Sequence, residues 1–208
     1  MLRFPILLSS LAMLSTMSLF AQDPLPPARV TPQSASECEK LFSKISFDQL
    51  PGNLNAYIRD EWFLLTGGTP ESYNSMTAGW GGTGILWGKQ VAFVFVHTDR
   101  FTYKFMEQSD MFTMSFMDRD ARPALANIFG RKSGRDTDKV TEAGVTPIAT
   151  PEGGVTYQQA RLVIVCKRIA KVPLTQDLIT GDIGFKYGEN SYHCQYVGQI
   201  IGIWKRNP

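Results

Sequence analysis

The clearest pattern in the chain is a run of β-branched and aromatic residues in its middle. Residues 90–97 read QVAFVFVH without a breaker, which predicts a strand buried on at least one face. Residues 112–117, FTMSFM, alternate apolar and polar positions as a half-buried strand does. Residues 62–66, 162–172 and 196–204 are further predicted strands. Strands therefore dominate the expected secondary structure.

Short helices and turns are expected between these strands. Two of the predicted helices cover residues 38–44 and a segment that Asp99 caps and that ends near Ser109. The other two cover residues 119–129, ended by Gly130, and a segment from residue 136 or 137 to residue 143, ended by Gly144. Residues 67–70, GGTP, read as a turn. The helices do not alternate regularly with strands, which argues against βαβ units. We therefore expect a mainly β fold, an antiparallel barrel or sandwich with helical insertions, and a barrel of about six strands fits the length.

The N-terminal region differs from the rest. A short positive start with Arg3 precedes an uncharged, mostly apolar stretch, so residues 1–21 follow the plan of a secretory signal peptide. Residues 22–36 are rich in Pro, Ser and Gln and predict a flexible, exposed leader, and residues 37–208 form the expected domain. No comparable apolar stretch follows, so no membrane span is expected after signal cleavage; an uncleaved anchor is the alternative. Export to the periplasm is the prediction.

Charge and cysteine content exclude several classes of protein. Without residues 1–21 the chain has 187 residues, with 20 Lys and Arg against 19 Asp and Glu. This near-balance excludes a strongly basic nucleic-acid binder. The three cysteines, Cys38, Cys166 and Cys194, lack CxxC or His-containing ligand spacing, so neither a disulfide framework nor a zinc site is indicated.

A glycine-rich segment is the first candidate for binding chemistry. Residues 79–84 formally match G-x-G-x-x-G, but a strand follows them where a dinucleotide fingerprint needs a helix. The larger unit, residues 73–82, places Asn74, Ser75, Thr77 and Trp80 around small side chains and suits a planar heteroaromatic ring with polar edges. On spacing alone, a Gly-rich hairpin with a packed Trp is the better interpretation.

Two further segments offer positive charge. Ser133 and Arg135 stand before a predicted helix start, where amides, a hydroxyl and cations could converge on a phosphate. A solvated charged loop is the alternative. Arg100 and Thr102 form a second anion-binding pair directly after the strongest strand.

The two histidines do not indicate a hydrolase. No Ser or Cys nucleophile motif accompanies them, so a catalytic triad is unsupported. His97, at a strand end, is expected to be structural, whereas His193 stands in a polar segment where a core and a ligand-facing position are both open.

Taken in order, these segments resemble the flavin reductase-like family of FMN-binding split barrels, in particular its flavoredoxin-like members. The carrying motifs are NSMTAGWGG at 74–82, the strand at 91–96 with RFTY at 100–103, SGRDTDK at 133–139 with AGVTP at 143–147, and YVGQI at 196–200. The resemblance spans residues 64–203.

The resemblance implies a six-stranded antiparallel Greek-key split β-barrel and a homodimer with FMN near the subunit interface. It places the isoalloxazine ring along residues 74–77 and Trp80, and His193 near the cofactor. The residues implied to bind FMN are Asn74, Ser75, Met76, Thr77, Trp80, Arg100, Thr102, Ser133, Arg135, Lys139 and His193.

An oxidoreductase is the implied function, in which bound FMN passes electrons to flavin, iron or a protein acceptor. NADH or NADPH is the donor in such relatives, but an exported protein lies away from that pool, so a redox partner protein becomes the alternative donor. Two alternative functions remain open: a non-catalytic FMN-binding electron carrier, and an exported binding protein of the same fold that has lost its ligand. The few residues after the last predicted strand favour the second alternative.

Overall fold

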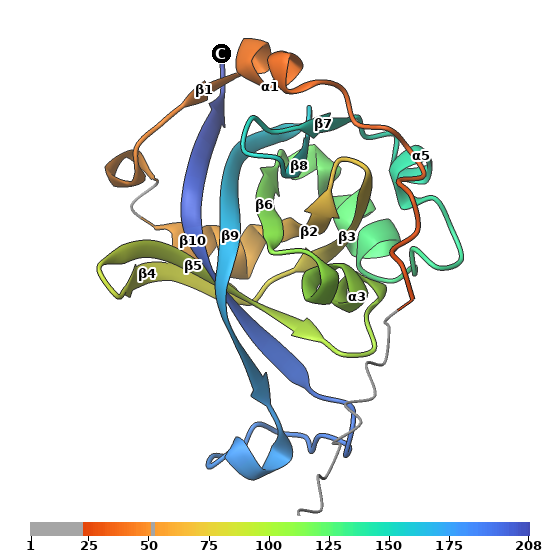
Figure 1. The fold of residues 1–208 in the computed structure, drawn as a ribbon, viewed down its shortest axis with the longest axis vertical. Coiled ribbons are helices and arrows are strands. Elements are labelled where there is room, and N and C mark those ends of the chain that lie inside the picture. The colour runs from red at the N-terminus through yellow and green to blue at the C-terminus, as the bar shows by residue number, and fades with distance from the viewer. Residues whose placement is uncertain (1–22, 51–52) are drawn as a thin grey trace, which may run out of the picture.

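The main feature of the fold is one large antiparallel sheet (Figure 1), seen in a computed structural model that describes residues 23–50 and 53–208. Its strands lie in the order β3-β2-β6-β9-β10-β5-β4, with β1 paired to β10, and β7 pairs with β8 in a separate two-stranded sheet. The strands are β1 Phe42–Lys44, β2 Phe63–Thr69, β3 Ser72–Ala78, β4 Gly81–Leu86, β5 Lys89–His97, β6 Met111–Met117, β7 Pro147–Ala149, β8 Val155–Tyr157, β9 Ala160–Leu174 and β10 His193–Arg206. The predicted signal peptide lies outside the described residues.

The predicted fold class, a mainly β split barrel, is confirmed. Six strands of the main sheet, β2, β3, β5, β6, β9 and β10, have at least seven residues each. The strands at the two ends of the order, β3 and β4, are not paired with each other among the described residues. The barrel is therefore split along a seam between β3 and β4.

Most predicted helices form, with shifted boundaries. The helical segments are α1 Ala35–Leu41, η1 Phe47–Gln49, α2 Leu54–Ala56, η2 Tyr57–Glu61, α3 Phe101–Gln108, η3 Arg119–Ala121, α4 Arg122–Ala124, η4 Leu125–Phe129, α5 Lys139–Ala143 and η5 Gln176–Leu178. The helix predicted for residues 38–44 is wrong in its second half, because β1 pairs with β10 there. The predicted turn also begins later: Gly67 and Gly68 still belong to β2. Gly144 ends α5 in the left-handed region, at φ 63°, as predicted.

Both faces of the central strands are buried, which explains their continuous apolar sequence. On β9, Ile164 and Cys166 belong to one hydrophobic cluster, whereas Val163 and Val165 belong to a second one on the opposite face. The second cluster includes Tyr157 of β8. Hence β7 and β8, with the helices near them, cover a sheet face that would otherwise meet solvent.

The leader runs along the surface beside β3 and α3. Most of its side chains are exposed, yet Tyr73 and Lys104 donate hydrogen bonds to the carbonyl oxygens of Val30 and Pro24. The Ala28 amide donates to the carbonyl of Glu71. The segment therefore contacts the domain through its backbone carbonyl and amide groups.

Two absences hold within the described part of the chain. No helix there is long and apolar enough to cross a membrane. All three cysteines are free and buried, and no cluster of three His, Cys, Asp or Glu side chains suits a metal ion.

Candidate functional site

A hollow of about 580 Å³ opens at the seam of the barrel. The chain passes from edge strand β3 to edge strand β4 through Gly79 and Trp80, and this crossing forms one wall. The residues lining the hollow are Met76, Thr77, Ala78, Gly79, Trp80, Phe95, His97, Asp99, Arg100 and His193.

Glycine is required at the crossing because the backbone packs closely against its neighbours. A Cβ atom at Gly79 would lie 2.7 Å from the Trp62 ring, and one at Gly81 would lie 2.5 Å from the carbonyl oxygen of Phe93. Gly81 also has φ +152°, a conformation that other residues rarely adopt. The glycine-rich sequence thus fixes the shape of this wall.

Aromatic and imidazole rings also line the hollow. The His193 ring lies 5.1 Å from the ring of Trp80 and 4.8 Å from that of His97, between ring centroids. The Tyr187 hydroxyl is 2.7 Å from Nδ1 of His193. Burial, together with the charges of His97 and Arg100, lowers the pKa of His193 to about 4. His193 is therefore neutral at pH 7, and its position is fixed by Tyr187. His97, expected to be structural, lines the hollow as well.

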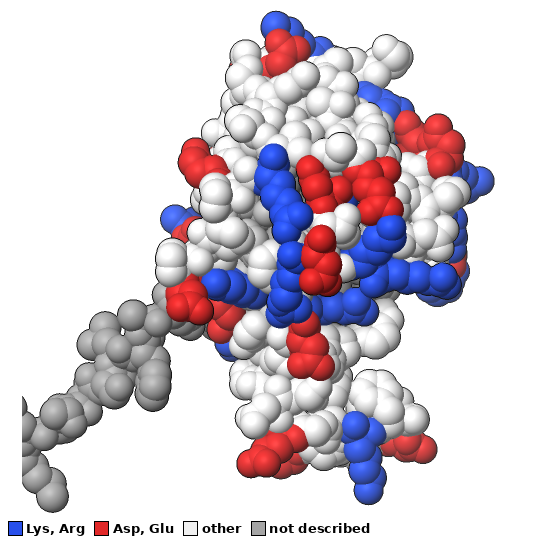
Figure 2. All heavy atoms as spheres, turned by 90° about the vertical axis from the view of Figure 1, so that its right-hand side faces the viewer, with Lys and Arg blue, Asp and Glu red and all other residues white. Residues whose placement is uncertain are grey.

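A smaller recess of about 90 Å³ adjoins the hollow and shares Met76, Asp99 and Arg100 with it. Five basic side chains and one acidic one line the recess: Arg100, Arg131, Lys132, Arg135, Lys139 and Asp99. Lys132 is paired with Glu142, but the remaining cations give the recess a net positive charge. Figure 2 shows Lys and Arg side chains gathered, with acidic ones among them, on the side of the molecule that carries α5.

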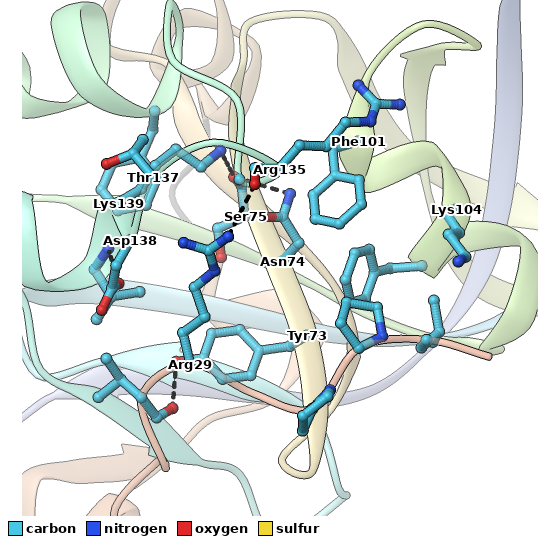
Figure 3. A pocket seen from close by; sticks show the side chains of 18 of the residues that line it. Arg29, Tyr73, Asn74, Ser75, Phe101, Lys104, Arg135, Thr137, Asp138 and Lys139 are labelled. Atoms are coloured by element: carbon cyan, nitrogen blue, oxygen red, sulfur yellow. Dashed lines mark hydrogen bonds between the residues drawn. The ribbon is translucent and has the colours of Figure 1, made fainter. Parts of the chain in front are cut away.

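The buried end of this recess is the ammonium group of Lys139. The residue is 6 % exposed, and its Nζ donates a hydrogen bond to the carbonyl oxygen of Ser75 (Figure 3). Burial, and secondarily the charge of Arg100, lowers its pKa to about 8. No carboxylate among the described residues forms an ion pair with it. The recess therefore contains a buried cation that lacks an anionic partner.

The N-terminus of α3 also faces the recess. Asp99, predicted to cap this helix, does not do so: the N-cap is Arg100, and no side chain accepts a hydrogen bond there. The Asp99 carboxylate instead accepts a hydrogen bond from Ser191 and lies 3.5 Å from Nδ1 of His97. The first two amides of α3 consequently remain open to an anion, whereas the amide of Tyr103 donates to the carbonyl oxygen of Arg100.

Asn74 links the helix to the loop before α5. Its Nδ2 donates to the Thr102 hydroxyl at 2.7 Å, and both residues are buried. A Cβ atom at Gly134 would lie 2.1 Å from Oδ1 of Asn74. Only glycine allows the loop to approach this closely, so the contact sets the position of Ser133 and Arg135.

The hydroxyl groups of Ser75 and Thr77 on β3 are hydrogen-bonded to other groups of the protein. Ser75 is hydrogen-bonded to Thr66 and Tyr157 in the interior, and Thr77 donates to the carbonyl of Leu125. The hydrogen bond from Lys139 shows that the carbonyl of Ser75 is directed to the free edge of β3 and not to β2. Since alternate residues of a strand direct their backbone groups to the same edge, the amide of Thr77 faces this edge too.

The structure brings most of the predicted site residues together. The hollow is lined by Met76, Thr77, Trp80, Arg100 and His193, and the recess by Arg100, Thr102, Ser133, Arg135 and Lys139. Asn74 and Ser75 line neither and support the site from behind. Sequence reasoning missed Phe95, His97 and Asp99 as lining residues, and Tyr187 as the partner of His193. The position of Phe95, His97 and Asp99 at or just after the end of a predicted strand could have identified them as site residues. No sequence pattern identified Tyr187.

A family model described as "Flavin reductase like domain" matches residues 62–207. No curated protein matches the chain.

Several solved structures share the fold. Flavoredoxin of Desulfovibrio vulgaris (Miyazaki F) is 22 % identical with a TM-score of 0.54, over 70 % of this chain and 69 % of that one. An FMN-binding domain of flavin reductases-like enzyme from Shewanella baltica is 17 % identical with a TM-score of 0.58, over 79 % and 77 %. Nitrilotriacetate monooxygenase component B from Bacillus cereus is 14 % identical with a TM-score of 0.54, over 76 % and 79 %.

Proposed function

The chain belongs to the flavin reductase-like domain family, and from that membership we propose that it binds FMN at the barrel seam and acts as an oxidoreductase. The names of similar structures, a flavoredoxin and a monooxygenase component, support redox chemistry. The residues of the recess and of the hollow suit the two ends of FMN.

The recess suits the phosphate end. A phosphate monoester carries close to two negative charges, and Arg100, Arg135 and Lys139 surround the recess beside the open N-terminus of α3. The Ser133 hydroxyl adds a hydrogen-bonding group there. The buried ammonium of Lys139, which has no carboxylate partner in the part of the chain that the structure describes, is the single observation that carries the proposal.

The hollow suits the ring end. Trp80, although 57 % exposed, lies against His193 and offers an apolar face beside a flat glycine-rich wall. The backbone amide of Thr77 and the neutral imidazole of His193 can donate hydrogen bonds to the polar edge of a heteroaromatic ring. Because Tyr187 contacts Nδ1 of His193, we propose that Nε2 is the atom directed to the cofactor.

FMN, when bound, supplies the redox chemistry itself. The residues of this chain hold the phosphate, orient the ring and provide hydrogen-bond donors at its edge. The same donors favour negative charge on the ring and so influence its reduction potential.

The flavin spectrum tests the proposal directly. The purified chain, titrated with FMN, should bind about one FMN per subunit and show a perturbed visible band. A chain that binds no FMN, and carries none when isolated from its own compartment, would overturn it.

The electron donor depends on the compartment. Residues 1–21 have the sequence of a signal peptide, so we propose export to the periplasm and a protein redox partner as donor, with NADH or NADPH as the alternative. Stopped-flow mixing of the FMN-loaded protein with NADH and NADPH separates the two: rapid flavin bleaching would favour the nicotinamide donor, and its absence the partner protein. The terminal acceptor is flavin, iron or a protein.

A homodimer is part of the proposal. Large apolar side chains are exposed on the β4–β5 hairpin, where Ile85 and Trp87 are 66 % and 70 % exposed. A second subunit that packs against the hairpin would bury this apolar surface. Sedimentation of the wild type and of Ile85→Asp should give a dimer and a monomer, respectively.

A further inference from the structure

A second, larger pocket lies behind the phosphate recess, between the leader and the body of the domain. It measures about 730 Å³, and its floor is the free edge of β3, including Tyr73 and Asn74. One side is formed by α3 and the other by residues 134–140, while Pro24, Leu25, Pro26 and Pro27 form the roof. The recess and the pocket share Phe101, Phe129, Gly134, Arg135 and Lys139 as a common wall.

The roof is apolar for a chemical reason. Three of its four residues are prolines, which have no backbone N–H to satisfy. The carbonyls of Pro24 and Pro26 accept hydrogen bonds from Lys104 and Ser72 at the edges of the pocket. The leader therefore presents few polar backbone groups to an apolar ligand below it.

The pocket also has a strong charge preference. Four cations line it, Arg29, Lys104, Arg135 and Lys139, against a single carboxylate, Asp138. That carboxylate already accepts hydrogen bonds from the Val140 and Thr141 amides and from the Thr141 hydroxyl, as the N-cap of α5. Figure 3 shows Lys104 on one side of the pocket and Arg29 on the other.

We propose that this leader-covered pocket binds an organic anion with an apolar body, such as an aromatic or branched carboxylate. The volume is in the range of small-molecule sites, and the aromatic rings of Tyr73, Phe101 and Phe105 line it together with the prolines. The charged group pairs with a cation at either side of the pocket, Arg29 or Lys104, and this leaves the recess free for phosphate. Arg29 also donates to the carbonyl oxygen of Arg135, so the leader contacts the loop that borders the recess.

Fluorescence titration of the full chain with saturating FMN tests this, with 1-anilinonaphthalene-8-sulfonate as the anionic probe and N-phenyl-1-naphthylamine as its uncharged analogue. The sulfonate should bind at one saturable site, and Arg29→Gln combined with Lys104→Gln should weaken it at least fivefold. The same variant should leave the affinity for the uncharged analogue within twofold. Lys186→Gln, an exposed lysine outside the pocket, is the matched control and should change neither.

Leu25→Ser removes apolar surface from the roof and should weaken both probes. Unchanged sulfonate affinity in the charge variant, or displacement of the sulfonate by FMN, would overturn the proposal. Failure of FMN to bind would count against the proposed function alone, because the probe titrations can be read without FMN.

Discussion

The Nζ atom of Lys139 donates a hydrogen bond to the carbonyl oxygen of Ser75, on the free edge of the strand that borders the seam. A buried ammonium held by a neutral carbonyl, with no ion-pair partner in the described residues, costs free energy in the ligand-free protein. An anion bound beside the ammonium would offset that cost, and the phosphate of FMN has the required negative charge. The proposed function makes this residue the most informative one to change.

Lys139→Met should weaken FMN binding and stabilise the FMN-free protein. Loss of a charge-assisted hydrogen bond costs on the order of 1.5–3 kcal/mol of binding free energy. Because burial lowers the pKa of Lys139 to about 8, removing the charge should raise the free energy of unfolding by roughly 1–3 kcal/mol at pH 7. FMN titration and denaturant unfolding measure the two effects.

Lys186→Met, in an exposed segment, should change neither quantity. An unchanged FMN affinity in Lys139→Met would place the phosphate elsewhere. A fall in the stability of the FMN-free variant would instead make Lys139 a structural residue.

FMN affinity should also depend on pH through Lys139. In the FMN-free protein its pKa is about 8, and a bound phosphate would raise that pKa, so binding favours the protonated amine. The affinity should therefore be fully present below pH 8 and fall as the pH rises above 8 toward the pKa of the complex, by up to about tenfold per pH unit. Fluorescence titrations from pH 7 to 10 measure this.

Lys139→Arg serves as the control for the pH effect, since arginine remains charged throughout this range. Its affinity should stay flat between pH 8 and 10 even if geometry lowers its absolute value. The same decline in both proteins would assign the titration to another group.

Gly134→Ala should loosen the loop that carries Ser133 and Arg135. The added Cβ atom would lie 2.1 Å from Oδ1 of Asn74, so the loop or the amide must move, at a cost of about 1–3 kcal/mol in stability and a weaker FMN complex. Gly84→Ala is the matched control, because nothing lies within 4 Å of its Cβ position. Thermal melts and FMN titrations of both variants measure these effects. Equal melting temperatures and equal FMN affinities in the two variants would mean that this contact does not hold the loop.

Strands were predictable from sequence where the fold buries both of their faces. The run around Val163, Ile164 and Val165 is continuously apolar because two separate clusters enclose β9, and that leaves an unambiguous signal. The three-residue strands β7 and β8 gave no sequence signal, because so short a segment has no measurable hydrophobic period. They form where Thr113 and Ser115 of β6 bond to β8.

The site residues were predictable as a set, but their orientations were not. Whether Ser75 faces the ligand or the interior depends on how β3 pairs with β2, and a shift by one residue would reverse it. The local sequence around Asp99 is typical of an N-cap. Its carboxylate instead accepts a hydrogen bond from Ser191, which belongs to a distant segment of the chain. Most hydrogen bonds between the leader and the domain use backbone groups of the leader, which carry no sequence signal.

Trp80→Leu should increase the fluorescence of bound flavin. An indole in contact with the isoalloxazine ring quenches its emission by electron transfer, and Trp80 lines the hollow beside His193. Trp87→Leu is a close control, since that tryptophan is also exposed but does not line the hollow. Time-resolved emission of FMN-loaded variants should show a longer flavin lifetime only for the Trp80 variant. Equal lifetimes in the two variants would remove Trp80 from the ring site and place FMN away from the seam.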